Sequence, residues 1–410
     1  ATTEIYTLSL HDALPISLLA SSTAPMAQTL PGPDLLSFAH GVVPMRVEAD
    51  AAAKVRPDLA LRLIDGDRRG FVVTAPVPPG TRVAFVYELP APTVFERFAV
   101  PDVLETPSPG QTFFRDVRVL GSATGADEGF VELASATLAT HRARGQETEL
   151  AIQRRTPVRW LRLELSGAVD APRPKVALEF SELIGQGRQE AAPTAHGFGG
   201  VWKGRGVKLA LRQQGPAVDG CYDREGQLAG TVRGNVLHAT GATRQGIPST
   251  FVAVLGGDGQ LHALRSSNGG PFYASVGTLD KKAAPPAACF ETAAPTLGCG
   301  SVIHAIGFDF DAATLRPDAA PALDALHAGL AADAAARVTI EGHTSSEGAE
   351  AYNLELSQAR AQSVVDALVQ RGIARDRLAA SGAGEARPIA SNDDESGRSL
   401  NRRVEVRCTS

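Results

Sequence analysis

The chain has 410 residues, enough for roughly two to four domains, and carries a formal net charge of −5 with 5% aromatic residues. Nucleic-acid partners require clustered cationic and stacking side chains, so the negative balance, the lack of basic runs and the few aromatic rings argue against DNA or RNA. The sequence contains no run of about 18 or more apolar residues, and therefore no candidate transmembrane helix.

The N-terminal 27 residues are interpreted separately from the rest of the chain. Residues 1–16 (ATTEIYTLSLHDALPI) resemble the conceptual translation of a common sequencing-adapter oligonucleotide, and we exclude them from the fold prediction; a genuine amphipathic N-terminus is the alternative. Residues 17–27 pass from apolar to small side chains, a pattern typical of the end of a secretory signal peptide. The sequence therefore predicts an exported protein.

Residues 32–187 contain short runs of β-forming residues, separated by turns rich in Pro and Gly. The clearest runs are 82–89, 112–121, 158–165 and 175–183. Apolar and charged side chains mostly alternate along the second run, as in a strand with one buried and one solvated face. We therefore predict a β-sandwich of jelly-roll type. VRWLRLELSG, which starts the third run, resembles the penultimate strand of discoidin-type, galactose-binding-like domains, although such a fold does not by itself imply sugar binding.

A linker is expected at residues 186–197, and residues 197–279 after it are rich in Gly and predict successive β-hairpins. A stretch of about 80 residues has room for roughly eight short strands, so we predict a small β-barrel. Gly200-Val201-Trp202 resembles the Gly-x-Trp element on the first strand of calycin and avidin-like barrels. In those families the Trp fills one end of the barrel, and no ligand follows from the triplet.

A second linker, rich in Ala and Pro, is expected at residues 280–298. The four cysteines, Cys221, Cys289, Cys299 and Cys408, fit no zinc-site spacing and permit three disulfide pairings. An exported protein favours disulfides over free thiols. Because Cys299 and Cys408 bracket the C-terminal region, we expect them to pair, which leaves Cys221 for Cys289; reduced cysteines are the alternative.

Strands and helices alternate through residues 299–410. We expect, in chain order, a strand, a helix, a strand, a long helix and two final strands, at 302–310, 316–332, 337–342, 349–371, 376–384 and 402–408. Pro317 suits the first turn of the first helix, and Gly372 suits the end of the long helix. The alternation predicts an α/β sandwich with the helices on one face of a mixed sheet.

Three segments of this region occur in a fixed order: GHTSSEG at 342–348, YNLELSQARA at 352–361 and NRRVEV at 401–406. Together they resemble the OmpA-like domain, a module that grips peptidoglycan in the periplasm of Gram-negative bacteria. The resemblance covers the chain from about Gly300 to Cys408. It implies the α/β fold predicted above and non-covalent binding to the cell wall.

The long helix carries Asn353, Leu356 and Arg360 at i, i+3 and i+7, and this spacing places them on one face. The resemblance implies that Arg360 binds a carboxylate of the diaminopimelate residue in the peptidoglycan stem peptide, for which a planar guanidinium is well suited. It also implies that Phe310 and Asp311 line the same pocket, together with Leu356.

One ligand position departs from the family. The usual GHTD motif places an acid against the ammonium group of the ligand, and the matching residue here is Ser345. A hydroxyl accepts a hydrogen bond but supplies no charge. Charge-assisted hydrogen bonds contribute about 1.5–3 kcal/mol against about 1 kcal/mol for neutral ones, so we expect binding that is weaker by roughly tenfold. Glu347 in the same turn is the best substitute acid, with Asp311 and Glu350 as alternatives.

Two of these assignments have a structural alternative. Phe310 could pack in the core at a strand end. Arg360 could form a surface ion pair with Glu355 or Asp366, which lie within helical reach of it.

Four other polar residues also have alternative interpretations. Asn353 and Asn401 could pin loops by hydrogen bonds as readily as they could contact a ligand. Arg402 and Arg403 alternate on the last expected strand, so at most one of them can face the pocket.

Catalytic motifs are not evident. The sequence has no GxSxG nucleophile motif and no HExxH metal motif. His343 follows a strand, but the equivalent His of the OmpA-like family is structural. We do not interpret Asp309 and Asp311 as a carboxylate pair for acid–base catalysis. We predict a protein that is not an enzyme and that needs no metal or cofactor.

The sequence thus predicts a periplasmic protein, associated with the cell wall or outer membrane, whose residues 299–410 bind peptidoglycan. The two β domains would present a further surface to a glycan or an envelope protein. Three other interpretations remain open: a carbohydrate-binding protein acting through the sandwich, an outer-membrane porin, and a stator-type protein anchored by a membrane helix.

Overall fold

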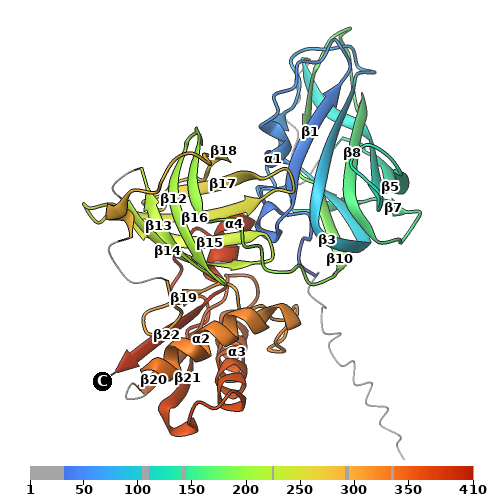
Figure 1. Cartoon of the computed structure of the whole chain (residues 1–410). Helices are drawn as coiled ribbons and strands as arrows, with labels where there is room; N and C mark the ends of the chain where they lie inside the picture. Colours follow the sequence, from blue (N-terminus) through green and yellow to red (C-terminus); the bar gives the residue numbers. More distant parts are fainter. Residues whose placement is uncertain are drawn as a thin grey trace, which may run out of the picture. The chain divides into compact units, whose positions relative to one another are not determined.

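The structure is a computed structural model that describes residues 32–103, 110–140, 145–223, 226–290, 295–333 and 337–409. The residues from Gly32 to Ser410 form one compact unit with three β-sheets (Figure 1). The predicted adapter segment 1–16 and signal-peptide remnant 17–27 lie outside the described residues. Among the described helices, none combines the length and apolar character that a membrane crossing requires.

The first sheet has ten strands, whose main order is β1-β3-β8-β4-β5-β7. Its strands are β1 (Val43–Ala49), β2 (Phe71–Val72), β3 (Arg82–Pro101), β4 (Gln111–Ser122), β5 (Val131–Thr137), β6 (Glu147–Glu149), β7 (Ala151–Ile152), β8 (Val158–Ala168), β9 (Ala177–Phe180) and β10 (Ile184–Gln189). Strand β3 pairs with β1 and β8 along its first half and with β6 and β10 along its second half. One hydrogen-bonded network therefore connects all ten strands, and the two separate layers of a sandwich are not confirmed.

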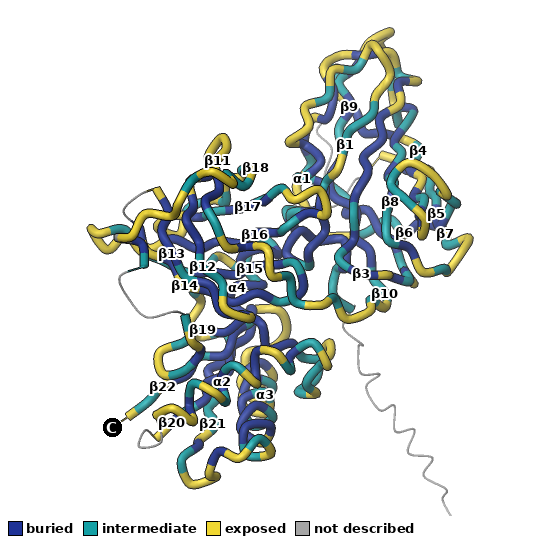
Figure 2. Tube along the Cα trace, in the orientation of Figure 1, coloured by how far each residue is buried: buried dark blue, intermediate teal, exposed yellow. Residues whose placement is uncertain are grey.

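Side-chain alternation explains why this part of the chain forms a sheet with one apolar face. Along β8 the buried positions Leu161, Leu163 and Leu165 alternate with Arg162 and Glu164 (Figure 2). The two charged residues form an ion pair with each other at 2.9 Å, on the solvated face. A strand with period-two burial can pack one face while the other stays in water.

Two short elements precede and follow β1, namely the 3-10 helix η1 (Phe38–His40) and helix α1 (Leu59–Arg62). Residues 184–189 form β10 and pair with β3, so the expected linker at 186–197 begins later than predicted. The reason is that Ile184 and Gly185 complete the edge of the sheet beside Ala99 and Phe98.

The second sheet is a closed barrel of eight antiparallel strands, as predicted. The strands are β11 (Gly200–Arg205), β12 (Val207–Gln214), β13 (Ala217–Tyr222), β14 (Gly226–Arg233), β15 (Val236–Ala242), β16 (Pro248–Leu255), β17 (Gln260–Ser267) and β18 (Tyr273–Leu279). Pairing between β11 and β18 closes the ring. Trp202 of the Gly-x-Trp triplet is buried in the apolar interior, and its indole Nε1 donates to the Phe198 carbonyl oxygen at 2.8 Å.

The third sheet has the order β19-β22-β20-β21, with only β20 and β21 parallel. Its strands are β19 (Val302–Ile303), β20 (Arg337–Gly342), β21 (Leu378–Gly382) and β22 (Val404–Thr409). The helical elements are η3 (Pro317–Ala319), α2 (Ala320–Ala332), α3 (Glu350–Gln370), η4 (Arg375–Arg377) and α4 (Glu395–Asn401). One apolar cluster joins α2 and α3 to the sheet, through residues such as Leu326, Val365, Ile340 and Val406.

The expected strand at 302–310 is wrong beyond Ile303. After this residue the backbone turns to the barrel, because the amides of His304 and Ala305 both donate to the Thr231 hydroxyl, at 2.9 and 3.2 Å. The long helix ends as predicted at Gly372, whose φ of +105° is readily adopted only by glycine.

Two disulfides are present, Cys221–Cys289 and Cys299–Cys408. They are the two pairs that the sequence analysis favoured. The first attaches the short 3-10 helix η2 (Ala287–Cys289) to barrel strand β13, so this part of the expected linker 280–298 is fastened to the barrel.

Candidate functional site

The candidate site forms where the turn after β20, the start of α3, the turn at 308–315 and helix α4 meet. The turn is positioned by close packing: a side chain on Gly342 would place its Cβ 2.3 Å from the Ser357 carbonyl oxygen of α3. The next two amides are also fixed, since His343 N donates to Arg403 O at 3.0 Å and Thr344 N to Gly384 O at 2.9 Å. The GHTSSEG turn therefore has a defined backbone conformation.

Arg360 is half-buried, and it is the main cation of the site. Its Nε donates to the Ala312 carbonyl oxygen at 2.9 Å, and its guanidinium lies 5.1 Å from the centroid of the Phe308 ring. Burial, followed by the nearby charge of Arg402, lowers the pKa of Arg360 to about 10, so the side chain is charged at neutral pH. Within the described ranges, no carboxylate lies at ion-pair distance from it.

The alternative role of Arg360 as a surface ion pair is not observed. Asp366 pairs with Arg375 at 2.9 Å instead, and Glu355 is exposed on the solvent side of α3. An unpaired cation that is partly removed from water is a favourable place for an anionic ligand group.

Asp311 and Phe310 lie in the turn beside Arg360. Asp311 has a φ of +52° and accepts a hydrogen bond from the Tyr352 hydroxyl at 2.5 Å. Phe310 is 46% exposed, so it does not pack in the core. The ring that contacts Arg360 belongs to Phe308, two residues earlier in the chain.

Ser345 is buried, and its hydroxyl is directed at an acid in the same turn. The residue is 4% exposed, and its Oγ donates to Glu347 Oε2 at 3.3 Å. Glu347 itself is largely exposed, and it lies 3.6 Å from Arg398 and 3.5 Å from Arg402. Ser345, which stands where the family has an acid, is therefore hydrogen-bonded to another carboxylate, that of Glu347. We refer to Arg360, Asp311, Ser345 and Glu347 as the open site.

The two asparagines pin loops. The buried Asn353 donates from Nδ2 to Glu385 Oε2 at 2.5 Å and so ties the start of α3 to the loop after β21. Asn401 accepts from the amides of Ile389 and Ala390, at 2.8 and 3.1 Å. Leu356 is half-buried on α3.

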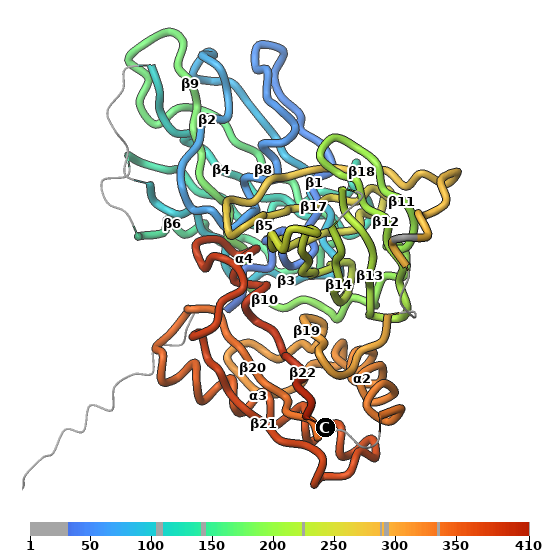
Figure 3. The backbone as a smooth tube through the Cα atoms, turned by 90° about the vertical axis from the view of Figure 1, so that its left-hand side faces the viewer, coloured from blue at the N-terminus to red at the C-terminus, as the bar shows by residue number. Residues whose placement is uncertain are grey.

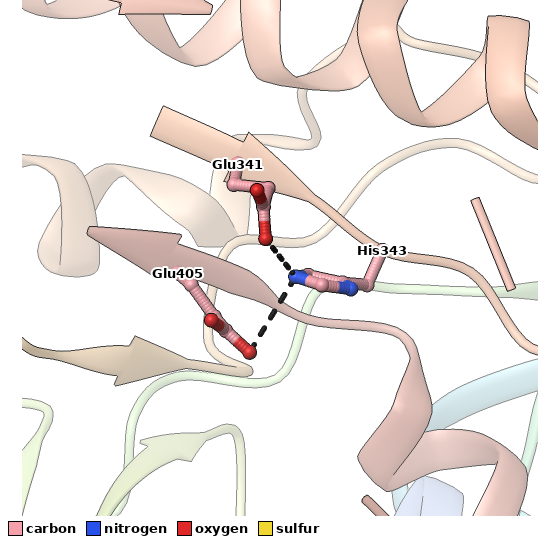
Figure 4. A group of neighbouring side chains, drawn as sticks. All are labelled: Glu341, His343 and Glu405. Atoms are coloured by element: carbon pink, nitrogen blue, oxygen red, sulfur yellow. Dashed lines mark ion pairs between the residues drawn. The ribbon is translucent and has the colours of Figure 1, made fainter. Parts of the chain in front are cut away.

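Arg403 points away from the open site, to a second charged group formed by Glu341, His343 and Glu405 (Figure 4). His343 Nε2 lies 3.0 Å from Glu341 Oε1 and 3.4 Å from Glu405 Oε1. Burial, followed by the charge of Arg403, lowers the pKa of His343 to about 4, so its ring is neutral at neutral pH.

These three side chains are of types that can ligate a metal ion, but arginines already hold both carboxylates. Glu341 pairs with Arg387 at 2.7 Å and with Arg407 at 2.9 Å, while Glu405 pairs with Arg403 at 2.6 Å. Three guanidinium charges against two carboxylates oppose the entry of a further cation. The arrangement favours a structural role, joining β20 to β22. We refer to these six residues as the closed cluster.

Comparison with known proteins defines the class to which this site belongs. Residues 307–402 match the OmpA family, so the C-terminal part of the chain is an OmpA-family domain, as the sequence predicted.

Among its relatives, the chain is 44% identical over 101 residues to outer membrane porin F of Pseudomonas fluorescens, which covers 25% of this chain and 31% of that protein. It is 43% identical over 99 residues to outer membrane protein A of Bordetella avium, covering 24% of this chain and 51% of that protein. It is 46% identical over 101 residues to the peptidoglycan-binding protein ArfA of Mycobacterium tuberculosis, covering 25% and 31%. The chain therefore spans only 31% to 51% of the length of these relatives.

Among solved structures, the peptidoglycan-associated lipoprotein of Burkholderia pseudomallei aligns with 29% identity and a TM-score of 0.24, covering 25% of this chain and 88% of that one. The relatives are named as proteins of the cell envelope, in keeping with the periplasmic, cell-wall or outer-membrane location predicted from the sequence.

Sequence reasoning missed several residues around the open site. Phe308 and Tyr352 each lie within two positions of a predicted site residue in the sequence. Their aromatic side chains next to such residues could have identified them. Glu385, Glu395 and Arg398 gave no such signal, because they reach the site from the loop after β21 and from helix α4, which the sequence analysis did not predict.

Proposed function

We propose that residues 299–410 bind peptidoglycan non-covalently and anchor the two β domains to the cell wall. The observation that carries this proposal is Arg360, a charged side chain that is half-buried, is oriented by Ala312 and Phe308, and has no carboxylate partner among the described residues. A carboxylate of the diaminopimelate stem peptide would complete it with a bidentate contact. The OmpA-family match and the ArfA relative, which is named as a peptidoglycan-binding protein, support the same ligand.

We further propose that Glu347, rather than Ser345, receives the ammonium group of the ligand. Ser345 is almost fully enclosed, whereas the Glu347 side chain is 61% exposed and accepts the Ser345 hydroxyl. The serine then acts by orienting the glutamate. Asp311 and the exposed ring of Phe310 would line the side of the pocket next to Arg360, with Leu356 below them on α3.

In this proposal the β domains at 32–187 and 197–279 are a scaffold carried by the wall anchor, with no catalytic role. That the first domain is a jelly roll is also a proposal, and glycan binding by this domain is the alternative to a scaffold role. Binding of residues 28–190 to a glycan array would favour the sugar-binding alternative over a scaffold.

A direct test uses the complete chain and purified sacculi of the diaminopimelate type. We expect the protein to co-sediment with sacculi at low salt, and free L-Ala-γ-D-Glu-meso-diaminopimelate to compete. The matched control is the same tripeptide with both diaminopimelate carboxylates amidated, which should compete poorly because its diaminopimelate residue then offers Arg360 no anion. A folded protein that stays in the supernatant, or equal competition by both tripeptides, would contradict the proposal.

A further inference from the structure

Strand β14 of the barrel lies beside the start of the C-terminal domain at β19 (Figures 1 and 3). Thr231 and Arg233 alternate on β14, so they lie on one face, and both contact the segment that leads from β19 to α2. The Thr231 hydroxyl accepts the amides of His304 and Ala305, which holds the chain just before the turn at 308–315. The barrel therefore supports the segment that carries this part of the open site.

Arg233 contacts residues on both sides of the turn. A side chain on Gly307, just before the turn, would place its Cβ 2.5 Å from the Arg233 guanidinium carbon, so the guanidinium occupies that space. After the turn, Arg233 Nε donates to Asp318 Oδ2 at 3.1 Å, and the Asp318 side chain is only 10% exposed. Arg316 is a second cation near this acid, with its Nε 3.6 Å from Asp318 Oδ1. One barrel side chain thus holds the chain where it enters and where it leaves the turn.

The two ends of the turn are also bonded to each other. The Arg316 amide donates to the Gly307 carbonyl oxygen at 3.0 Å. Inside this bond, Phe308 and Leu315 form an antiparallel β-bridge. The turn is therefore a short hairpin whose placement follows that of its base, and the base is the part that rests on Arg233.

Both groups that orient Arg360 belong to this hairpin. Arg360 Nε donates to the Ala312 carbonyl oxygen, and its guanidinium lies against the Phe308 ring. The Tyr352 hydroxyl ties the tip of the hairpin to α3 through Asp311, whereas the barrel holds its base. A bidentate contact with a carboxylate depends on the plane of the guanidinium, so the orientation of Arg360 matters for affinity.

We propose that Arg233 is a positioning residue for the wall-binding site: by holding the base of the hairpin at 308–315, the barrel keeps Arg360 in the orientation that a ligand carboxylate requires. This inference rests on the proposed function, and it gives the barrel a part in binding. A guanidinium that is oriented before the ligand arrives loses less freedom on binding, which raises affinity. Because coupling is reciprocal, a ligand on Arg360 should also stabilise the contact between Arg233 and the hairpin.

The first measurement uses the complete chain without ligand. Selective ¹⁵N-arginine labelling gives an NMR signal for Arg360 Nε–H, which is identified by its loss in Arg360→Lys. Hydrogen-bonded to Ala312, this proton should exchange slowly with water in the wild type. Arg233→Gln removes the guanidinium that Gly307 rests on, and it should speed this exchange by about fivefold or more.

A control and a second variant accompany this measurement. Arg212→Gln is the matched control, because Arg212 is also a half-buried barrel arginine that pairs with an aspartate, Asp219. It should leave the Nε–H exchange unchanged. Gly307→Ala is the second variant: it keeps the charges of Arg233 and Asp318 but places a Cβ where the guanidinium lies, so it should act like Arg233→Gln.

The second measurement is calorimetric titration with the meso-diaminopimelate tripeptide. Arg233→Gln and Gly307→Ala should each weaken binding by about fivefold, and the Arg212→Gln control should not. In an Arg360→Lys background, Arg233→Gln should have no further effect, because a lysine ammonium is a point charge without a plane to orient. An equal loss in both backgrounds would show that Arg233 does not act through Arg360.

The outcomes separate this inference from the proposed function. If the wild-type chain does not bind the tripeptide, the wall-binding function fails, whereas faster exchange in Arg233→Gln still supports the positioning of Arg360. Unchanged Arg360 exchange in both variants overturns the positioning role. Should both variants fail to fold, the labelled wild type decides: bound tripeptide should slow exchange of Arg233 Nε–H, and unchanged exchange there overturns the coupling.

Discussion

The open site and the closed cluster lie on either side of one turn, and they use charge in opposite ways. In the closed cluster every carboxylate is paired with arginine and the His343 side chain is almost fully enclosed. In the open site Arg360 is partly buried and lacks an acidic partner in the described part of the chain, while Glu347 is exposed. The comparison shows that charges fully paired within the protein serve to join strands. A charged side chain without a partner of opposite charge, such as Arg360, instead marks a place where a ligand can supply that partner.

The largest effect on stability should come from removing the disulfide that joins the two ends of the C-terminal domain. Cys299→Ser combined with Cys408→Ser removes a disulfide between residues separated by 109 positions, one of them on β22 beside the closed cluster. The loop-entropy model gives a loss of about 4–5 kcal/mol in the free energy of unfolding. Chemical denaturation measures it, and peptide mapping of the oxidised wild type provides the check, since a Cys289–Cys299 bridge would refute the pairing.

Breaking the closed cluster should be the next most destabilising change. Glu341→Ala leaves Arg387 and Arg407 without a shared carboxylate, and we expect a loss of about 3 kcal/mol in unfolding free energy. Glu355→Ala, which removes an exposed acid of α3, is the control and should change stability by less than about 0.5 kcal/mol. Equal effects of the two substitutions would show that the cluster is not a structural unit.

Removing the cation of the open site should weaken ligand binding and change stability little, which is the reverse of the effect expected for Glu341→Ala. Arg360→Ala should reduce binding of the diaminopimelate tripeptide by about 2–4 kcal/mol, because the ligand carboxylate then has no counter-charge. Its unfolding free energy should change little, since Arg360 forms no ion pair in the described structure. Calorimetric titration against Arg375→Ala, which removes a surface arginine paired with Asp366, checks this. Wild-type affinity in Arg360→Ala would make the pocket assignment wrong.

Lowering the pH should also affect the closed cluster and the open site differently. His343 has an ordinary pKa of 6.5 that burial and then Arg403 lower to about 4 in the folded state. The unfolded chain thus takes up this proton first, so the contribution of neutral His343 to stability is complete above about pH 6.5 and is lost as the pH falls toward about 4. We expect this loss to be on the order of 2 kcal/mol, and smaller in His343→Gln when unfolding is followed across this window. Arg360, with a pKa of about 10, keeps its charge throughout.

The smallest effect concerns the departure at Ser345. Ser345→Asp restores the family's acid beside Glu347. Because Glu347 is proposed to receive the ammonium group already, the gain in tripeptide binding should be well below the roughly tenfold, or about 1.4 kcal/mol, that a new charge-assisted hydrogen bond would give. In a double-mutant cycle with Arg360→Ala the two changes should be coupled, because they act on opposite ends of one zwitterion. Ser346→Asp, at the exposed neighbouring position, is the control. A full tenfold gain from Ser345→Asp alone would contradict the assignment of the ammonium group to Glu347.

Much of the fold was evident from local patterns in the chain. Period-two burial identified β8, hairpin turns indicated an eight-stranded barrel, and the long helix ended at Gly372 as its conformation requires. The motif order identified the OmpA-family domain and, within it, Arg360 as the residue to examine. These features depend on neighbours within a few residues, so the order of amino acids is sufficient to specify them.

The features that sequence could not supply all depend on partners far away in the chain. The strand expected to reach residue 310 stops at Ile303 because Thr231 of the barrel takes the next two amides. The aromatic partner of Arg360 is Phe308, and Glu347 shares its arginines with Glu395, a residue of a helix that the sequence did not predict. Side-chain pairing across distant elements depends on how those elements pack in three dimensions, and no periodicity within one segment encodes which of several acids an arginine will meet.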